Sequence, residues 1–215
     1  MQHRLTSPEI NAYAEQFTTP ETPALAALNR ETNMKVAMPI MLSGHLQGAV
    51  LTMLSHMIRP AVILEIGTYT GYSAICLAQG LRDGGVLHTI DINEELADMN
   101  QRHWQAAGVA SRIQAHTGNA TAIIEALPGP FDLVFIDADK VNYGNYYDQV
   151  ISKMQPGGYI LADNVLYEAE VLLPEDQMSK NARALHHFNQ KIAADPRVEQ
   201  VLLPVRDGML VMRVL

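Results

Sequence analysis

The sequence is poor in cysteine and has no long apolar run. Cys76 is its only cysteine, which excludes an intrachain disulfide and a Cys-x-x-Cys redox motif. The longest apolar runs are too short to span a bilayer, and the first residues, MQHRLTSPEI, contain no apolar core of signal-peptide length. We therefore expect a cytoplasmic protein.

Positive charge is also scarce. The 15 Lys and Arg residues are outnumbered by 23 Asp and Glu residues, which gives a formal net charge of −8. Broad binding to a phosphate backbone requires clustered Lys and Arg side chains. We therefore expect small-molecule substrates rather than nucleic acid.

Apolar residues, by contrast, are plentiful. They make up 48% of the 215 residues, which is enough for one compact domain with a complete core. No repeat or low-complexity tract divides the chain. We predict a single domain over residues 1–215, with helices in residues 1–60 and the core sheet in residues 61–215.

Three helices are expected before the sheet. Ser7-Pro8-Glu9 and Thr22-Pro23 each combine a side-chain cap with a proline in the first turn, so a helix should follow each of them. Ser43 is predicted to cap a third helix. In that helix Met53 and Met57 recur with leucines at helical spacing, and we predict that they lie in the core.

Further along the chain, apolar strands alternate with helices. The strands are predicted at residues 61–67, 86–90, 112–117, 131–137 and 157–162. Asn93 should cap the helix after the second strand. Two final apolar runs are joined by Arg206-Asp207-Gly208, and Asp-Gly between such runs is a hairpin signal. The pattern predicts a doubly wound, mostly parallel α/β sheet with an antiparallel edge at its C-terminal end.

Polar residues follow two of these strands. Asp137 ends a near-continuous apolar run, and Asp163 and Asn164 follow the next strand. If the two strands are neighbours, the three side chains meet at the carboxyl edge of the sheet, where open α/β sheets bind their ligands. Two carboxylates and an amide oxygen suit Mg²⁺, Ca²⁺ or Mn²⁺ rather than zinc. The alternative is that each Asp is only a helix cap or a turn residue.

A glycine-rich loop follows the first strand. It reads Gly67-Thr68-Tyr69-Thr70-Gly71, whereas the dinucleotide fingerprint has a glycine two positions after the first one. Tyr69 occupies that position, so we do not expect a pyrophosphate. Asp91 ends the second strand and is placed to accept both hydroxyls of a ribose. The alternative is a tight strand-to-helix turn without a ligand.

Six sequence blocks together resemble a known family. The blocks are LEIGTYTGYS at residues 64–73, TID at 89–91, GNA at 118–120, FDLVFIDADKVNY at 131–143, GGYILADNVLY at 157–167 and PRVEQVLLPVRDG at 196–208. From about residue 23 onward, the chain resembles the cation-dependent class I S-adenosylmethionine (SAM) O-methyltransferases, the group that contains the catechol and caffeoyl-CoA O-methyltransferases.

The resemblance implies a seven-stranded, Rossmann-like methyltransferase fold, usually in a homodimer. It implies that SAM is held by Ser43, Glu65, Gly67, Thr68, Ser73, Asp91, Ala120 and Asp139. It also implies a metal site, most simply for Mg²⁺, formed by Asp137, Asp163 and Asn164. Lys140 matches the family's proposed general base, and Met41 matches a residue near the transferred methyl group.

These roles agree with the chemistry of a phenolic acceptor. A phenol with a pKa near that of tyrosine is mostly protonated at neutral pH and is a poor nucleophile. A bound divalent ion favours its deprotonated form, and Lys140 lies close enough in sequence to a metal ligand to take the proton. The alternative is a surface lysine paired with Asp137 or Asp139.

The chain departs from the plant caffeoyl-CoA enzymes at Tyr167-Glu168, where those enzymes have Trp followed by Asn. Glu168 either accepts a hydrogen bond from a second substrate hydroxyl or faces water, and we favour water. The N-terminal basic residues associated with coenzyme A recognition are not evident, which disfavours a CoA thioester as the substrate.

The sequence therefore predicts a divalent-cation-dependent O-methyltransferase that acts on a small phenolic substrate with catechol-like or vicinal hydroxyls. Within the same fold, the alternative is a methyltransferase for a hydroxylated wobble uridine in tRNA. From other classes, the alternatives are an NAD-type oxidoreductase and a non-catalytic small-molecule binding module. The histidines show no ligand spacing, and we predict no role for them in the site.

Overall fold

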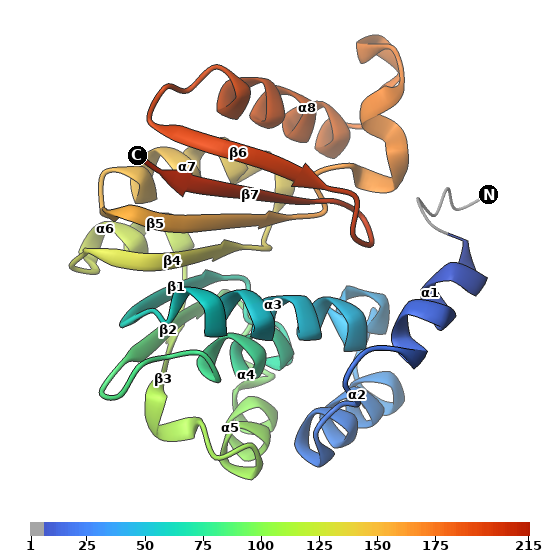
Figure 1. The fold of residues 1–215 in the computed structure, drawn as a ribbon, viewed down its shortest axis with the longest axis vertical. Coiled ribbons are helices and arrows are strands. Elements are labelled where there is room, and N and C mark those ends of the chain that lie inside the picture. Colours follow the sequence, from blue (N-terminus) through green and yellow to red (C-terminus); the bar gives the residue numbers. More distant parts are fainter. Residues whose placement is uncertain (1–6) are drawn as a thin grey trace.

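A seven-stranded sheet runs through the molecule in the order β3-β2-β1-β4-β5-β7-β6 (Figure 1). The computed structural model describes residues 7–215, so the first six residues of the predicted N-terminal region lie outside the described residues. The strands are β1 Val62–Ile66, β2 Val86–Asp91, β3 Ile113–Thr117, β4 Phe131–Ile136, β5 Met154–Asp163, β6 Val198–Leu203 and β7 Met209–Val214. The first five are parallel and β7 is antiparallel to both of its neighbours, which confirms the predicted doubly wound sheet with an antiparallel edge.

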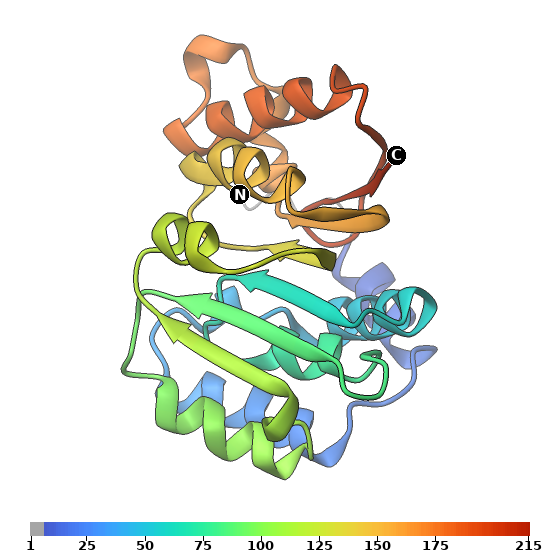
Figure 2. The ribbon, with the colours of Figure 1, turned by 90° about the vertical axis from the view of Figure 1, so that its left-hand side faces the viewer.

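Helices cover both faces of the sheet (Figure 2). They are α1 Pro8–Gln16, α2 Pro23–Lys35, α3 Gly44–Ile58, α4 Tyr72–Ala78, α5 Ala97–Ala106, α6 Ala120–Ala126, α7 Tyr143–Ile151 and α8 Lys180–Ala193. Buried side chains of α6, α7 and α8 pack on one face, and those of α2 to α5 pack on the other. No helix within residues 7–215 combines the length and apolar character that crossing a membrane requires.

The predicted side-chain caps are confirmed for α1 and α2, whereas Ser43 marks the start of α3 without capping it and Asn93 is not a helix cap. The hydroxyls of Ser7 and Thr22 accept hydrogen bonds from the backbone N–H three residues ahead. Ser43 precedes α3 but makes no such bond, because its own backbone is already helical. Asn93 lies four residues before α5, where its side chain instead accepts the N–H of Glu95 in a local turn.

The methionines predicted for the core are exposed: Met53 is 62% and Met57 is 74% accessible. The face of α3 that turns inward instead carries Gln47, Gly48, Leu51 and Ser55. A Cβ built on Gly48 would lie only 2.6 Å from the ring of Tyr72 on α4. The two helices therefore approach closely at Gly48, and the long methionines lie on the opposite, outward side of α3.

The antiparallel strand changes which residues reach the carboxyl edge of the sheet. The parallel strands β4 and β5 are neighbours and end level with each other, since Ile136 pairs with Ala162. Strand β7 runs the other way, and its first residue, Met209, pairs with Asp163. The turn between β6 and β7 is thereby brought to the edge where β1, β2, β4 and β5 end.

Candidate functional site

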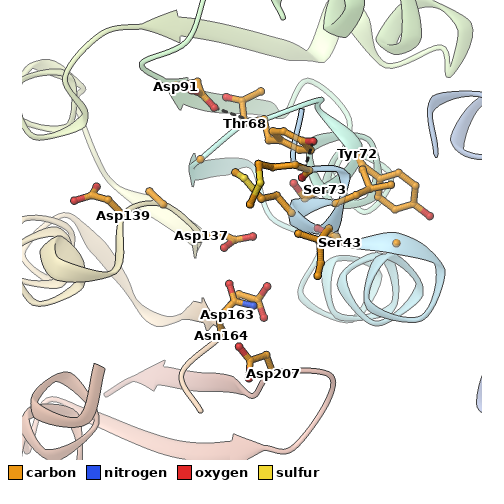
Figure 3. A pocket seen from close by; sticks show the side chains of 18 of the residues that line it. Ser43, Thr68, Tyr72, Ser73, Asp91, Asp137, Asp139, Asp163, Asn164 and Asp207 are labelled. Carbon is orange, nitrogen blue, oxygen red and sulfur yellow. Dashed lines mark hydrogen bonds between the residues drawn. The ribbon is translucent and has the colours of Figure 1, made fainter. Parts of the chain in front are cut away.

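A cavity of about 1730 Å³ opens over the carboxyl edge of the sheet. The sequence segment 35–46 and part of α1 form one wall, and residues from the segment 163–181 and the β6–β7 turn form the other. Every residue predicted for the site lines this cavity apart from Glu65, which is completely buried behind its wall. Figure 3 shows the carboxylates of Asp91, Asp137, Asp163 and Asp207 following one another across the cavity.

The glycine-rich loop brings β1 close to the end of β4. Gly67 has φ +105°, and a Cβ built on it would lie 2.1 Å from the carbonyl oxygen of Asp137. The backbone N–H of Asp137 also donates to the carbonyl of Ile66 at 2.9 Å. Only glycine fits between the two strand ends, so this residue sets the floor of the cavity.

Asp91 is held in place by the glycine-rich loop and by its own turn. Its two carboxylate oxygens accept the backbone N–H groups of Tyr69 at 2.7 Å and Asn93 at 2.9 Å. Each oxygen keeps a further lone pair, so the carboxylate is oriented and still able to accept hydroxyl groups of a ligand.

Glu65 lies beneath the loop in a small polar cluster. Its Oε2 accepts the hydroxyl of Thr89 at 2.6 Å, and the hydroxyls of Thr89 and Thr68 are also 2.6 Å apart. Its Oε1 is buried with no hydrogen-bond partner. Burial raises the pKa of Glu65 to about 8, against the hydrogen bonds from Ser73 and Thr89 that lower it.

At the centre of the cavity the ammonium of Lys140 lies among oxygen atoms. Lys140 Nζ donates to Asp137 Oδ1 at 2.8 Å, to Asn164 Oδ1 at 2.7 Å and to the hydroxyl of Tyr143 at 2.7 Å. It does not pair with Asp139, whose oxygens instead accept from Tyr146 and Asn142. A positive charge is therefore already stabilised by two of the three predicted metal ligands.

Asp163, the third predicted ligand, is 3% exposed. Its Oδ2 accepts the amide of Gln47 at 2.6 Å, whereas its Oδ1 is buried with no hydrogen-bond partner. Burial, with a further contribution from Asp137, raises the pKa of Asp163 to about 7. A buried carboxylate oxygen without a partner is costly, and a cation at this position would remove the cost.

The donor set fits a hard divalent cation. It consists of two carboxylates and one amide oxygen, the ligands that Mg²⁺ and Ca²⁺ prefer. Within residues 7–215 no group of three or more His, Cys, Asp and Glu side chains is arranged to hold a metal ion, which matches a set whose third member is Asn164. The hydroxyl of Tyr143 connects Lys140 with Asp163, because it accepts from Lys140 Nζ and also donates to the carbonyl of Asp163 at 3.0 Å.

Gln47, Arg206 and Asp207 are site residues that the sequence did not indicate. Gln47 is 1% exposed, and its carbonyl oxygen accepts Arg206 Nη1 at 2.6 Å while its amide holds Asp163. Arg206 Nη1 also donates to the carbonyls of Leu42, at 3.1 Å, and Ser43. An Asp-Gly turn before a strand antiparallel to the sheet is a signal that would have placed Arg206 and Asp207 at this edge.

The residues predicted to contact the methyl acceptor lie at the open end of the cavity. Met41 lies in a short 3-10 turn, Pro39–Met41, and the backbones of Tyr167 and Glu168 are left-handed, with φ 45° and 51°. The N–H of Glu168 donates to Asp207 Oδ1 at 2.6 Å, and its side chain is exposed. Burial, and then the nearby Glu168 carboxylate, raise the pKa of Asp207.

Comparison with known proteins matches this fold and cavity to one enzyme family. A family model described as O-methyltransferase matches residues 14–215. The caffeoyl-CoA O-methyltransferase of Mesembryanthemum crystallinum is 40% identical over 178 residues, which cover 78% of this chain and 70% of that protein. The match therefore extends over the sheet and the cavity described above.

Comparison with solved structures leads to the same family. The crystal structure of an O-methyltransferase from Bacillus cereus in complex with SAH superposes with a TM-score of 0.87 at 30% identity, covering 96% of this chain and 97% of that one. The O-methyltransferase TomG of Streptomyces achromogenes, involved in tomaymycin synthesis and solved with SAM, also has a TM-score of 0.87, at 27% identity, with 96% of each chain covered.

Proposed function

The chain belongs to the O-methyltransferase family and is a SAM-dependent O-methyltransferase, and from this premise we propose that it methylates a small phenolic acceptor with two vicinal hydroxyls in a divalent-cation-dependent reaction. Family membership sets aside the predicted alternatives of an NAD-type oxidoreductase and a non-catalytic binding module. The tRNA alternative concerns only the acceptor, and the acceptor screen below tests it.

One observation carries the proposal. Oxygen atoms of Asp137 and Asn164 converge on a single positive charge, and beside them the buried Asp163 has an oxygen without a partner. A cation held by these residues would favour the deprotonated form of a phenolic hydroxyl and orient two adjacent oxygens of the acceptor. Mg²⁺ is the best match to this set of oxygen donors, and Ca²⁺ and Mn²⁺ are the alternatives.

We assign the methyl donor to the opposite side of the same cavity. Asp91 is oriented to accept the ribose hydroxyls, Gly67 and Thr68 form the floor, and Glu65 lies behind it towards the methionine end. The remaining proposed contacts are Ser43, Ser73, Ala120 and Asp139. Met41 lines the same cavity, and we assign it a place near the transferred methyl group.

The proposed reaction needs alignment and the removal of one proton. The acceptor oxygen forms a bond to the methyl carbon while the carbon–sulfur bond breaks and its electron pair stays on sulfur. The hydroxyl proton passes to Lys140 Nζ, which must be uncharged to accept it. Lys140 Nζ donates to two of the three oxygen donors assigned to the cation, so it would stand beside the acceptor hydroxyl if a divalent ion were held there.

The first test is removal of the metal. Methyl transfer from SAM to a catechol probe should stop with EDTA and return with Mg²⁺. Mn²⁺ binding, followed by electron paramagnetic resonance, should be weakened by roughly 10- to 100-fold in Asp163→Asn. Activity that persists after complete chelation would contradict the metal assignment.

The second test addresses the base. Lys140→Ala should lower kcat by roughly 100-fold or more and leave the affinity for SAM nearly unchanged. Lys191→Ala is the matched control, because Lys191 pairs with Asp148 outside the cavity. If Lys140→Ala impaired only SAM binding, Lys140 would not be the base.

The acceptor is sought by incubating the enzyme with Mg²⁺ and labelled SAM against phenolic metabolites and undermodified tRNA, with mass spectrometry as the readout. We expect label on vicinal diols only, and label on tRNA alone would replace the small-molecule proposal.

We also propose that the enzyme is a homodimer. Helix α1 buries none of its residues and leaves Ile10, Tyr13 and Phe17 exposed, which is unusual for a helix that stays in water. Light scattering should give twice the chain mass, and Phe17→Glu should shift the distribution towards the monomer. A monomer at all concentrations would contradict this assignment.

A further inference from the structure

The single arginine that lines the cavity within residues 7–215 is occupied by its own chain. Arg206 Nη1 donates to Leu42, Ser43 and Gln47, all at or near the start of α3. Its charge therefore stabilises the junction between the β6–β7 turn and α3, and it does not project freely towards the acceptor.

The other cationic groups of the cavity wall are also paired. Lys140 is held by Asp137 at the centre, and Lys35 forms an ion pair with Glu31 at 3.1 Å. His45 Nε2 is 2.7 Å from the carbonyl of Thr19. Within the described residues, each of the four side chains with a positive or protonatable group that line the cavity (Lys35, His45, Lys140 and Arg206) makes at least one polar contact with its own chain.

Carboxylates at the open end of the cavity are less satisfied. Asp207 uses one oxygen for the N–H of Glu168, and the Glu168 side chain is exposed at the rim. Figure 3 shows Asp207 next to Asp163 and Asn164, on the side away from Asp91. An acceptor whose hydroxyls lie at Asp163 and Asn164 would therefore have the Asp207 carboxylate beside it and Glu168 in the same wall.

We infer that this end of the cavity selects acceptors by charge: the part of the phenolic acceptor that points away from the reacting hydroxyls is cationic or neutral, and Asp207 and Glu168 are the specificity-determining residues. A carboxylate there meets two like charges, and a CoA thioester brings several phosphate charges to a wall whose cationic side chains, among the described residues, already contact their own chain. The inference rests on the proposed function, because it assumes that the hydroxyls bind near Asp163.

The test uses matched catechols that carry an aminomethyl, a hydroxymethyl or a carboxymethyl group at the same ring position, together with caffeoyl-CoA. With Mg²⁺ and SAM, kcat/KM should fall in that order, with about 10-fold between the aminomethyl and carboxymethyl compounds at low salt. The ratio should shrink as KCl is raised, since the charges at the rim are screened. A carboxymethyl-catechol or caffeoyl-CoA preferred over the aminomethyl compound would overturn the inference.

Two charge-neutralising variants locate the effect. Asp207→Asn keeps an oxygen that can accept the N–H of Glu168, so the turn should fold, and Glu168→Gln changes an exposed side chain. The double variant should reduce the ratio to about 2-fold or less. Asp176→Asn, an equal charge change on an exposed residue outside the cavity, should leave the ratio unchanged. An unchanged ratio in the double variant would overturn the assignment of these residues.

Equilibrium binding separates this inference from the proposed function. The same compounds are titrated into the enzyme in the presence of SAH and Mg²⁺, and the dissociation constants should follow the same order. If no compound is methylated although the binding order holds, the proposed reaction is wrong and the charge selection stands. If all are methylated and bound equally, the proposed reaction stands and the charge selection is wrong.

Discussion

The two sides of the cavity differ in the residues that adopt left-handed backbone conformations where the chain turns. On the side assigned to SAM, the left-handed backbone positions at the strand ends are mostly glycines: Gly67, Gly71 and Gly118 have φ +105°, +77° and +143°. On the side assigned to the acceptor, Gly208 has φ +88°, but most such positions carry side chains: Met38, Asn164, Tyr167, Glu168, Ala169 and Arg206. A non-glycine residue in this region costs about 1 kcal/mol, so the acceptor side is the more strained of the two.

Hydrogen bonds between distant residues stabilise these strained conformations on the acceptor side. Arg206 bonds to the start of α3, and the N–H of Glu168 bonds to Asp207. On the SAM side the same shape follows from residues that adopt it without penalty. The difference implies that substitutions on the SAM side act through local geometry, whereas those on the acceptor side act through distant partners.

The largest effect is expected where the SAM side is tightest. Gly67→Ala places a Cβ 2.1 Å from the carbonyl of Asp137, so two strand ends must separate. We expect a loss of roughly 3 kcal/mol or more in the free energy of unfolding, measured in urea, and a loss of SAH binding of at least about 100-fold by calorimetry.

Gly84→Ala is the matched control for that variant. Gly84 has φ +74° but nothing within 4 Å of a built Cβ, so it isolates the conformational cost, which is about 1 kcal/mol. Equal losses in the two variants would show that backbone strain, rather than contact with Asp137, dominates on the SAM side.

The buried Glu65 should make the SAM side sensitive to pH. Its pKa is raised from 4.5 to about 8, so the folded state binds the proton more tightly than the unfolded chain does. The free energy of unfolding should therefore fall as pH rises from about 4.5 to about 8, by roughly 3 to 5 kcal/mol, and level off above that range. In Glu65→Gln this part of the pH dependence should disappear, as measured by urea unfolding across the range. Identical pH profiles would contradict the assignment.

On the acceptor side, Gln47→Leu should act at a distance. It leaves Arg206 without its side-chain acceptor and removes the hydrogen bond that Gln47 donates to Asp163, in a buried place. We expect a loss of roughly 2 to 3 kcal/mol in stability and weaker Mn²⁺ binding, with SAH affinity nearly unchanged. Gln149→Leu, which removes one surface bond to Thr121, should cost less than about 1 kcal/mol. If Gln47→Leu weakened only SAH binding, acceptor-side substitutions would not act through distant partners, and the proposed difference between the two sides would be wrong.

The smallest predicted effect on stability is a gain, whereas replacing a residue by glycine usually lowers stability. Ala169 has φ 66°, so Ala169→Gly relieves strain, and stability should stay the same or rise by up to about 1 kcal/mol. Ala122→Gly, in the regular helix α6, should lower it by about 1 kcal/mol. Thermal denaturation compares the two, and equal destabilisation would mean that residues 167–169 are not strained.

Much of the fold could be predicted because local patterns encode it. The apolar run before Asp137 and the one before Asp163 predicted two strands, and these are neighbours that end level with each other. The cap residues Ser7 and Thr22 were correct because a cap is a contact within a few residues. The predicted caps at Ser43 and Asn93 were wrong because a cap also requires an extended backbone in the right place: the Ser43 backbone is already helical, and the Asn93 side chain accepts an N–H in a local turn.

The parts of the site that could not be predicted depend on contacts between distant residues. Gln47 meets a partner 159 residues away in Arg206 and another 116 residues away in Asp163. Outside the cavity, His88 and His116 likewise stack across β2 and β3 although nothing in their spacing relates them. Sequence periodicity reports how a residue sits within its own strand or helix, and it carries no information about which side chain lies opposite.

By itself the sequence determined the order of strands and helices, the acidic residues at the strand ends and the glycine-rich loop, because burial, turn geometry and capping act over a few residues. Only the tertiary structure decided that the antiparallel β7 brings Arg206 and Asp207 to the mouth of the cavity, that Gln47 joins Arg206 to Asp163, and that Met53 and Met57 face outward. These outcomes follow from how whole helices and strands pack against one another, and packing depends on the shape of both partners at once.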